Sequence, residues 1–199
     1  MRKIISIVVF VTLVLSSTNS FSYDSDPKNF INELVNDAIA ILGNKNISKE
    51  DKKKKIETIA LQNVDIEALG MYTLGQTRKS LDQANLKKYK NLFEKYFLKS
   101  LTSRLTDYSS QKFEVLGAKQ KSETYTIVSS KINESSSSPE IKIDWRVYTK
   151  DPTKPLIRDL IVEGLSLAKT QKEEFASILN SNSNDINILF EKLEEFIKN

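Results

Sequence analysis

The hydrophobic pattern of this chain changes its period twice, and this change limits the folds open to it. From residue 29 to residue 108, apolar residues recur at steps of three and four, which is typical of amphipathic helices. Between residues 113 and 162 they alternate with polar residues, as in strands with one buried face. The helical period returns over residues 170–198. Helices followed by strands and then by helices predict an α+β fold with an antiparallel sheet.

The same pattern predicts where the individual elements lie. We expect helices over residues 29–42, 49–62, 86–108, 170–179 and 185–198. We expect a sheet of about four strands, over residues 113–116, 124–131, 140–148 and 156–162, with a serine-rich turn at 135–139. Gly70 and Gly75 lie in the densest apolar segment outside the N-terminal region, where we expect the backbone to approach a neighbour closely. A curled sheet packed against long helices would leave a tapering space that side chains or a ligand must fill.

The N-terminal segment is typical of a signal peptide. Arg2 and Lys3 precede an apolar run over residues 4–15 that is interrupted only by Ser6 and Thr12. A helix of that length covers roughly 18 Å, which is too short for a hydrocarbon core of about 30 Å. Serines at positions 20 and 22 predict cleavage before residue 23. We therefore expect residues 1–22 to be a signal peptide and residues 23–199 to be a single exported domain.

Charge and missing residue types argue against several classes of function. The chain has 30 Lys and Arg and 26 Asp and Glu; without residues 1–22, 28 basic residues remain, so the net charge falls from +4 to +2. This balance does not favour a nucleic-acid partner. The absence of Cys and His excludes a Cys nucleophile, a His general base and metal sites with His or Cys ligands. We expect a binding protein, with no catalytic residue, metal or cofactor.

Two segments carry motifs that are more specific than periodicity. Residues 69–75 read Leu-Gly-Met-Tyr-Thr-Leu-Gly and precede the aromatic-rich helix expected over 86–108. Residues 143–146 read Ile-Asp-Trp-Arg, and residues 158–167 read Arg-Asp-Leu-Ile-Val-Glu-Gly-Leu-Ser-Leu. Together they resemble the MlaC family, also called toluene-tolerance auxiliary proteins, in which a strand ends in a similar Asp-x-x-x-Glu-Gly-x-Ser run and leads into a helix. Because the last expected helix also resembles that family, the resemblance covers nearly all of the expected mature chain.

The resemblance implies a periplasmic phospholipid carrier. Its partners would be an inner-membrane ABC transporter complex and an outer-membrane complex of lipoprotein and porin, and its role would be to maintain lipid asymmetry. The implied fold is nuclear-transport-factor-like, with additional N- and C-terminal helices that enclose an apolar cavity. We expect a monomer without a cofactor. Two alternatives stay open: a periplasmic carrier or chaperone for lipoproteins, and a small periplasmic isomerase or hydrolase.

A soluble lipid carrier must keep acyl chains out of water. Two ordinary chains contain about 30 methylenes, and at about 0.8 kcal/mol each their exposure would cost roughly 24 kcal/mol. The predicted lipid-binding residues lie on one face of the alternating strands and on two helical segments. They are Leu69, Leu74, Phe93, Tyr96, Phe97, Ile141, Ile143, Trp145, Val147, Leu160 and Val162. The alternative is that these side chains fill an ordinary core.

Two clusters of charged residues each allow a structural and a functional interpretation. Asp159 and Glu163, with Tyr148 as a donor, could form an acid–base group. In the structural interpretation, which we favour, Asp159 pairs with a neighbouring arginine while Glu163 and Ser166 cap the turn into the next helix. Lysines at 52–55 form the densest charge on the chain. These four, Lys52, Lys53, Lys54 and Lys55, are either a solvated helix face or a docking surface for an acidic partner or an anionic lipid surface.

Overall fold

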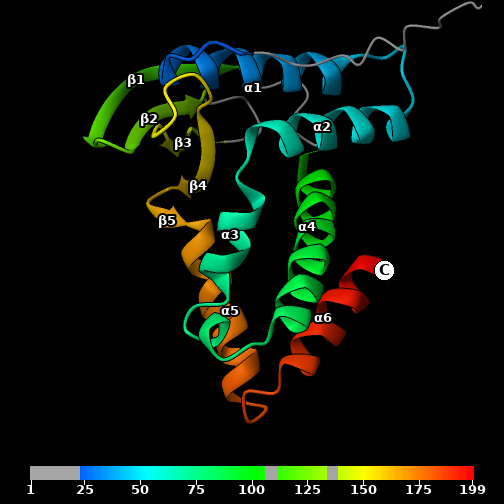
Figure 1. Ribbon diagram of the computed structural model, residues 1–199. Helices are drawn as coiled ribbons and strands as arrows, with labels where there is room; N and C mark the ends of the chain where they lie inside the picture. Colours follow the sequence, from blue (N-terminus) through cyan, green and yellow to red (C-terminus); the bar gives the residue numbers. More distant parts are fainter. Residues whose placement is uncertain (1–22, 106–111, 134–138) are drawn as a thin grey trace, which may run out of the picture.

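The computed structural model describes residues 23–105, 112–133 and 139–199 (Figure 1). The expected signal peptide, the end of the helix expected over 86–108 and most of the serine-rich turn lie outside these residues. The described residues form six α-helices and a five-stranded antiparallel sheet, which confirms the expected α+β class with a curled sheet. None of the helices in this part of the chain is both long and apolar enough to cross a bilayer.

Two helices precede the rest of the fold, and both begin at side-chain caps. Helix α1 (Pro27–Gly43) starts where the Asp26 carboxylate accepts hydrogen bonds from the backbone N–H groups of residues 28 and 29. Helix α2 (Lys49–Asn63) starts where the Ser48 hydroxyl accepts from the backbone N–H of residue 51. Such caps satisfy N–H groups that have no partner within the helix. Both helices agree with the predicted ranges to within about two residues at each end.

The next helices build the lower part of the molecule in Figure 1. They are α3 (Ile66–Thr73), the 3₁₀ turn η1 (Thr77–Lys79), α4 (Gln83–Leu105), α5 (Leu167–Asn180) and α6 (Ile186–Lys198). We did not predict α3, because its segment is apolar nearly all round and shows no one-sided period. Helix α5 begins three residues earlier than predicted, since the Ser166 hydroxyl caps it by accepting from the N–H of Lys169 at 3.0 Å.

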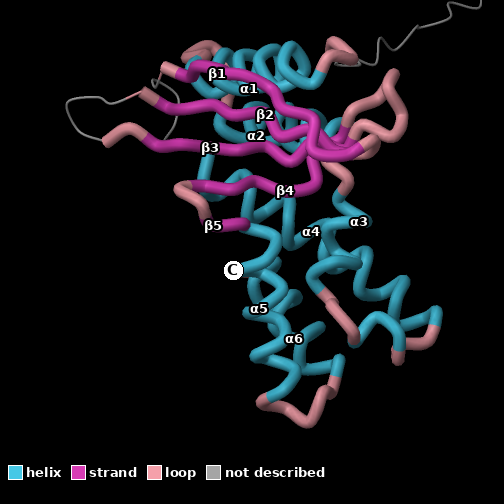
Figure 2. The backbone as a smooth tube through the Cα atoms, turned by 90° about the vertical axis from the view of Figure 1, so that its left-hand side faces the viewer, coloured by secondary structure: helices cyan, strands magenta, loops and turns pink. Residues whose placement is uncertain are grey.

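The five strands pair in chain order (Figure 2). They are β1 (Phe113–Ser122), β2 (Tyr125–Ile132), β3 (Ile141–Tyr148), β4 (Leu156–Val162) and β5 (Leu165–Ser166). The predicted end of the first strand at residue 116 is wrong, because Gly117 lies at a register shift within β1 and not in a turn. The short strand β5 was also missed. It follows a tight turn in which Glu163 and Gly164 have positive φ values of 49° and 82°.

One face of the sheet, which we call the inner face, carries the side chains of Ile141, Ile143, Trp145 and Val147. The β2–β3 register places Val128 opposite Trp145 and Arg146 opposite Ile127, so the two faces separate as the alternation predicts. The core of the inner face, the sheet cluster, joins the sheet to α1 and α2. It consists of Phe30, Ile31, Leu34, Ile59, Val128, Val147 and Ile157.

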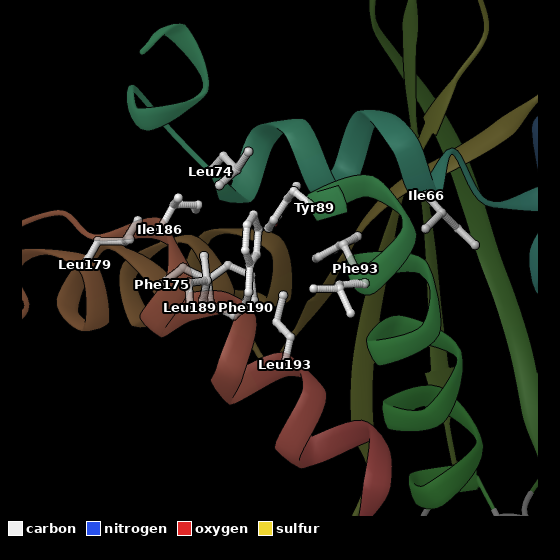
Figure 3. Close-up of a cluster of buried hydrophobic side chains, with 11 residues drawn as sticks. Ile66, Leu74, Tyr89, Phe93, Phe175, Leu179, Ile186, Leu189, Phe190 and Leu193 are labelled. Carbon is white, nitrogen blue, oxygen red and sulfur yellow. The ribbon is translucent and has the colours of Figure 1, made fainter. Parts of the chain in front are cut away.

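A second core, the helical cluster, is formed by α3, α4, α5 and α6 (Figure 3). It consists of Ile66, Leu74, Tyr89, Leu92, Phe93, Phe175, Leu179, Ile186, Leu189, Phe190 and Leu193. Gly70 confirms the expected close approach, because a Cβ at this position would lie 2.8 Å from the Phe93 ring. Tyr89 is fully buried, and its hydroxyl lies 2.7 Å from that of Thr73. This burial raises the pKa of Tyr89 well above its usual value.

The two clusters meet between α2 and α3. Val64 packs against both clusters and forms a bridge with Ile157 of β4. The backbone N–H of Asp65 donates to the carbonyl oxygen of Ile157 at 2.9 Å. Arg158 is the extra residue at a β-bulge, and its guanidinium contacts the Asp65 carboxylate at 2.6 Å and stacks 3.5 Å from the centre of the Tyr148 ring. These contacts of Val64 and Asp65 with β4 fix the start of α3 to the sheet.

Candidate functional site

Burial along the inner face falls from one end of the sheet to the other. At the closed end, Val128 and Val147 are 0% exposed and Ile157 is 5% exposed, because they form one cluster with side chains of α1 and α2. At the opposite end, the apolar residues of the inner face are only partly buried or exposed, although Ser130 between them is 2% exposed. We call this region the open end, and it consists of Ile132, Ile141, Ile143, Val162 and Leu165.

The strand register brings the open-end residues together. Ile132 pairs with Ile141, and Ile143 pairs with Val162, which in turn pairs with Leu165. Directly paired residues lie on the same face of an antiparallel sheet, with Cβ atoms about 4.5–5.5 Å apart. Leu165 is 68% exposed. None of the five belongs to either core cluster of the described residues. Among the described residues, the open end is therefore a partly exposed apolar surface that lies outside both packed cores.

Trp145 lies at the boundary between the two ends. It is partly buried, pairs with Val128 on one side and Leu160 on the other, and contacts the Phe113 ring edge-on at 6.3 Å. Its indole Nε1–H donates to the Ser130 hydroxyl at 2.8 Å. This hydrogen bond satisfies the polar atom of a largely apolar side chain.

The predicted lipid-binding residues fall into three groups. Leu74 and Phe93 belong to the helical cluster and Val147 to the sheet cluster, and all three are buried as packed core. Five others are partly buried beside these cores: Leu69, Tyr96 and Phe97 beside the helical cluster, and Trp145 and Leu160 beside the sheet cluster. The remaining three, Ile141, Ile143 and Val162, lie at the open end. Direct lipid contact stays a prediction for all eleven residues. The open-end residues are the best candidates, because a side chain must have accessible surface to contact a lipid.

Sequence reasoning missed two residues of the open end, Ile132 and Leu165, and it missed Phe113 beside them. Phe113, Ile132 and Leu165 share the inner face with the predicted residues through the strand register. Phe113 and Ile132 pair directly at the start of β1 and the end of β2. Their sequence signal was the apolar character at a strand terminus, which indicates a face only when the register with the neighbouring strand is known.

A separate pocket of about 270 Å³ lies between α3 and α4. Ile66, Gly70 and Phe93 contribute apolar lining. The rest of the lining is polar or charged: Glu67, Lys87, Lys90, Asn91 and Glu94. Small-molecule sites usually measure about 300–1,000 Å³ and are mostly apolar. This pocket is therefore too small and too polar to hold two acyl chains, and the apolar surface of the sheet is the better candidate site.

The acidic residues of the 158–167 motif have structural partners. Asp159 is buried and accepts hydrogen bonds from the Ser166 hydroxyl at 2.6 Å and the Ala168 N–H at 3.0 Å. Arg146 lies 3.8 Å from it, which confirms the predicted pairing with an arginine. Glu163 does not cap α5 as predicted, because its carboxylate accepts from the backbone N–H of Lys142 on β3. These bonds fasten α5 and the last turn to the sheet.

The four consecutive lysines of α2 are not equivalent. The Lys52 ammonium donates to the carbonyl oxygen of Leu42 at 2.6 Å, and so satisfies the C-terminal end of α1. Lys53, Lys54 and Lys55 are exposed. The structural role of Lys52 leaves three lysines for the predicted docking surface.

Comparison with known proteins adds independent findings. Residues 32–195 match the family model described as MlaC protein. The fold is similar to that of the phospholipid-binding protein from Ralstonia solanacearum, solved in complex with a phospholipid. The TM-score is 0.69 at 18% sequence identity, over 84% of this chain and 94% of that one. No curated protein matches the chain significantly.

Proposed function

Because the chain belongs to the MlaC protein family, we propose that it binds phospholipid on the inner face of the sheet and carries it between membranes. The observation that carries this proposal is the open end, where five apolar residues share one face and lie outside both packed cores. A contiguous apolar surface that is only partly buried is typical of a binding site. The phospholipid complex of a protein with the same fold supports the choice of ligand.

The inner face suits acyl chains better than it suits a polar substrate. Its open end offers only Ile, Val and Leu side chains, and its two neighbouring polar groups, Ser130 and the Trp145 indole, bond to each other. Asp159, the buried acid of this region, pairs with Arg146 in the register, and so lies on the opposite face of the sheet. These features support a carrier without a catalytic step.

The same family relationship supports a more specific role, which we propose as well. The chain is exported to the periplasm and exchanges lipid, as a monomer, with an inner-membrane ABC transporter complex and an outer-membrane complex of lipoprotein and porin. Spontaneous release of the lipid into water would be too slow for this role, since full exposure of both acyl chains would cost roughly 24 kcal/mol. Lipid must therefore leave while the carrier is docked to a partner that offers an apolar path.

The experiment that tests this proposal is mass spectrometry of the natively purified protein. Residues 23–199 would be expressed with an export signal in a host that has membranes, purified without detergent, and measured intact and after solvent extraction. We expect diacyl phospholipid at near-stoichiometric yield. A protein free of lipid would contradict the proposal. Recovery of an acylated peptide in place of phospholipid would favour the lipoprotein carrier.

A further inference from the structure

The hydrogen bond between Ser130 and Trp145 lies inside an otherwise apolar face. Ser130 is 2% exposed and sits opposite Ile143, one pair nearer the open end than Trp145. Its hydroxyl donates to the Ile143 carbonyl oxygen at 3.0 Å and accepts from the indole N–H at 2.8 Å. A serine hydroxyl has only one hydrogen to donate. Both partners of this hydroxyl are thus fixed by the strands themselves.

This bond determines where the indole lies. Trp145 is directly opposite Val128, but its N–H reaches the next inner-face residue of β2, so the ring system leans diagonally toward the open end. The Phe113 ring meets it edge-on, with an interplanar angle of 90°. Rotation of the indole away from Ser130 would break this part-buried hydrogen bond, and the net contribution of such a bond is about 0.5–1.5 kcal/mol. The hydrogen bond to Ser130 and the contact with Phe113 therefore favour one orientation of the indole, in which the ring lies across the inner face of the sheet.

The Trp145 indole lies between the closed end and the open end of the inner face. On its far side, Val147 is completely buried in the sheet cluster, which includes side chains of both α1 and α2. On its near side, the apolar residues Ile141, Ile143 and Val162 are only partly buried, although Ser130 beside Ile143 is 2% exposed. An acyl chain that enters over the open end meets apolar side chains up to Trp145, and beyond it meets a core that is already filled.

We propose that Trp145, positioned by Ser130, is the end wall of the lipid site and limits the length of acyl chain that fits. This inference rests on the proposed function, because it assigns the deep end of the same site. Ser130 is then a positioning residue, which acts through the orientation of the indole. The methyl ends of the acyl chains contact the indole, and the headgroup stays at the open end near Leu165.

The chain offers a direct probe, because Trp145 is its single tryptophan. Purified protein would be loaded with phosphatidylethanolamine dibrominated near the methyl end of one acyl chain, near the middle, or near the carboxyl end. Bromine quenches tryptophan fluorescence at short range. We expect the strongest quenching, several-fold above the weakest, from bromines near the methyl end. The strongest quenching from the carboxyl end would overturn the inference, since it would place Trp145 at the mouth.

A parallel measurement separates failure of this inference from failure of the proposed function. Intact mass spectrometry of each loaded sample reports bound lipid independently of fluorescence. Lipid bound in full without quenching would show that the indole is ordinary core, while lipid binding itself would stand. Absence of bound lipid would contradict the proposed function instead.

Ser130→Ala tests the positioning role, and Ser129→Ala is its matched control. Ser129 lies on the opposite face of the same strand, where its hydroxyl donates to Asp144 at 2.6 Å. We expect Ser130→Ala to fold, to weaken the contrast between the brominated lipids, and to bind longer acyl chains several-fold better in competition than the parent does. Ser129→Ala should change neither readout. Equal chain-length preference in both variants and the parent would overturn the role of Ser130. If Ser130→Ala fails to fold, Trp145→Phe takes its place in the competition, where an unchanged preference would overturn the end wall.

Discussion

The helical cluster and the open end of the sheet are built from the same kinds of residues but differ in how far they are filled. In the helical cluster, Leu189, Phe190 and Leu193 are at most 1% exposed, because side chains from four helices converge on them. At the open end, Ile143 is partly buried and Leu165 is 68% exposed, although both lie on the inner face. Apolar patterning determines which way a side chain points. The number of elements that converge on it determines whether the protein fills the space itself.

The largest expected effect compares the two ends of a single strand. Val147→Asp should prevent folding, because an unpaired charge at a fully buried position typically costs about 3–5 kcal/mol, a large part of the stability of a small domain. Ile143→Asp should leave the protein folded, since its carboxylate can reach water, but should abolish lipid retention by placing a charge among acyl chains. Circular dichroism reports folding, and mass spectrometry reports bound lipid.

Ile127→Asp is the matched control for this pair of variants. Ile127 lies on the opposite face of the neighbouring strand and pairs with Arg146 and Lys119, so an aspartate there faces basic side chains. It should fold and retain lipid. The comparison of the two ends would fail if Ile143→Asp were folded and fully loaded with lipid, or if Val147→Asp were as stable as the parent.

An effect on stability alone, without loss of lipid from the folded protein, is expected from a cavity in the helical cluster. Phe190→Ala removes a ring that is 1% exposed and should lower the free energy of unfolding by about 3–5 kcal/mol. Denaturant unfolding measures this loss. The molecules that remain folded should bind the same amount of phospholipid, because the open end lies outside this cluster. Loss of lipid from folded protein would mean that the helical cluster itself contacts the ligand.

Sequence reasoning could predict most of the fold for identifiable physical reasons. The alternation in β3 was strong enough to assign the inner face, and Ser166 was correctly predicted to cap the turn into α5. The close approach at the Gly70 segment was also anticipated. Each of these depends on local chemistry: a strand period, a side-chain cap, or a residue without a Cβ.

Features that depend on pairing between distant segments could not be predicted in this way. The open end exists because Val162 pairs with Ile143 and Leu165 pairs with Val162, and no local pattern specifies that register. The division of the predicted lining into packed core and partly exposed surface depends on which of these side chains the helices cover, and no local pattern specifies this. Gly117 was misread because a glycine in a strand can mark a bulge as well as a turn.

Two glycines provide a test of packing at a smaller scale. Gly70→Ala should lower the free energy of unfolding by about 1–3 kcal/mol, because the added Cβ would lie 2.8 Å from the buried Phe93 ring and overpack the helical cluster. Higher helix propensity of Ala offsets only about 1 kcal/mol of this loss. At Gly117 a Cβ would meet nothing within 4 Å, so Gly117→Ala should leave stability unchanged or slightly higher. Equal losses at both positions, measured by denaturant unfolding, would show that backbone effects and not packing decide the result.

The smallest expected effect on stability concerns a surface that contributes to neither region. Lys53, Lys54 and Lys55 are exposed on α2, so reversal of their charge to Glu should leave both folding and bound lipid unchanged. We expect this triple variant to transfer lipid several-fold more slowly to membranes that carry the partner complexes, because charged patches steer the encounter of transient partners. Lys52 is kept, since its bond to the Leu42 carbonyl would otherwise confound the result.

The control for this variant must change the net charge by the same amount at another surface. Three exposed lysines away from α2 serve this purpose: Lys119, Lys121 and Lys150. If steering is specific to α2, their reversal to Glu should slow transfer less than reversal of the α2 lysines does. The difference should shrink as salt is raised, because the Debye length falls from about 30 Å at 0.01 M to about 8 Å at 0.15 M ionic strength. Equal transfer rates for the two triple variants at low salt would assign the α2 lysines to ordinary solvated surface and place docking elsewhere, with the lipid site on the inner face unaffected.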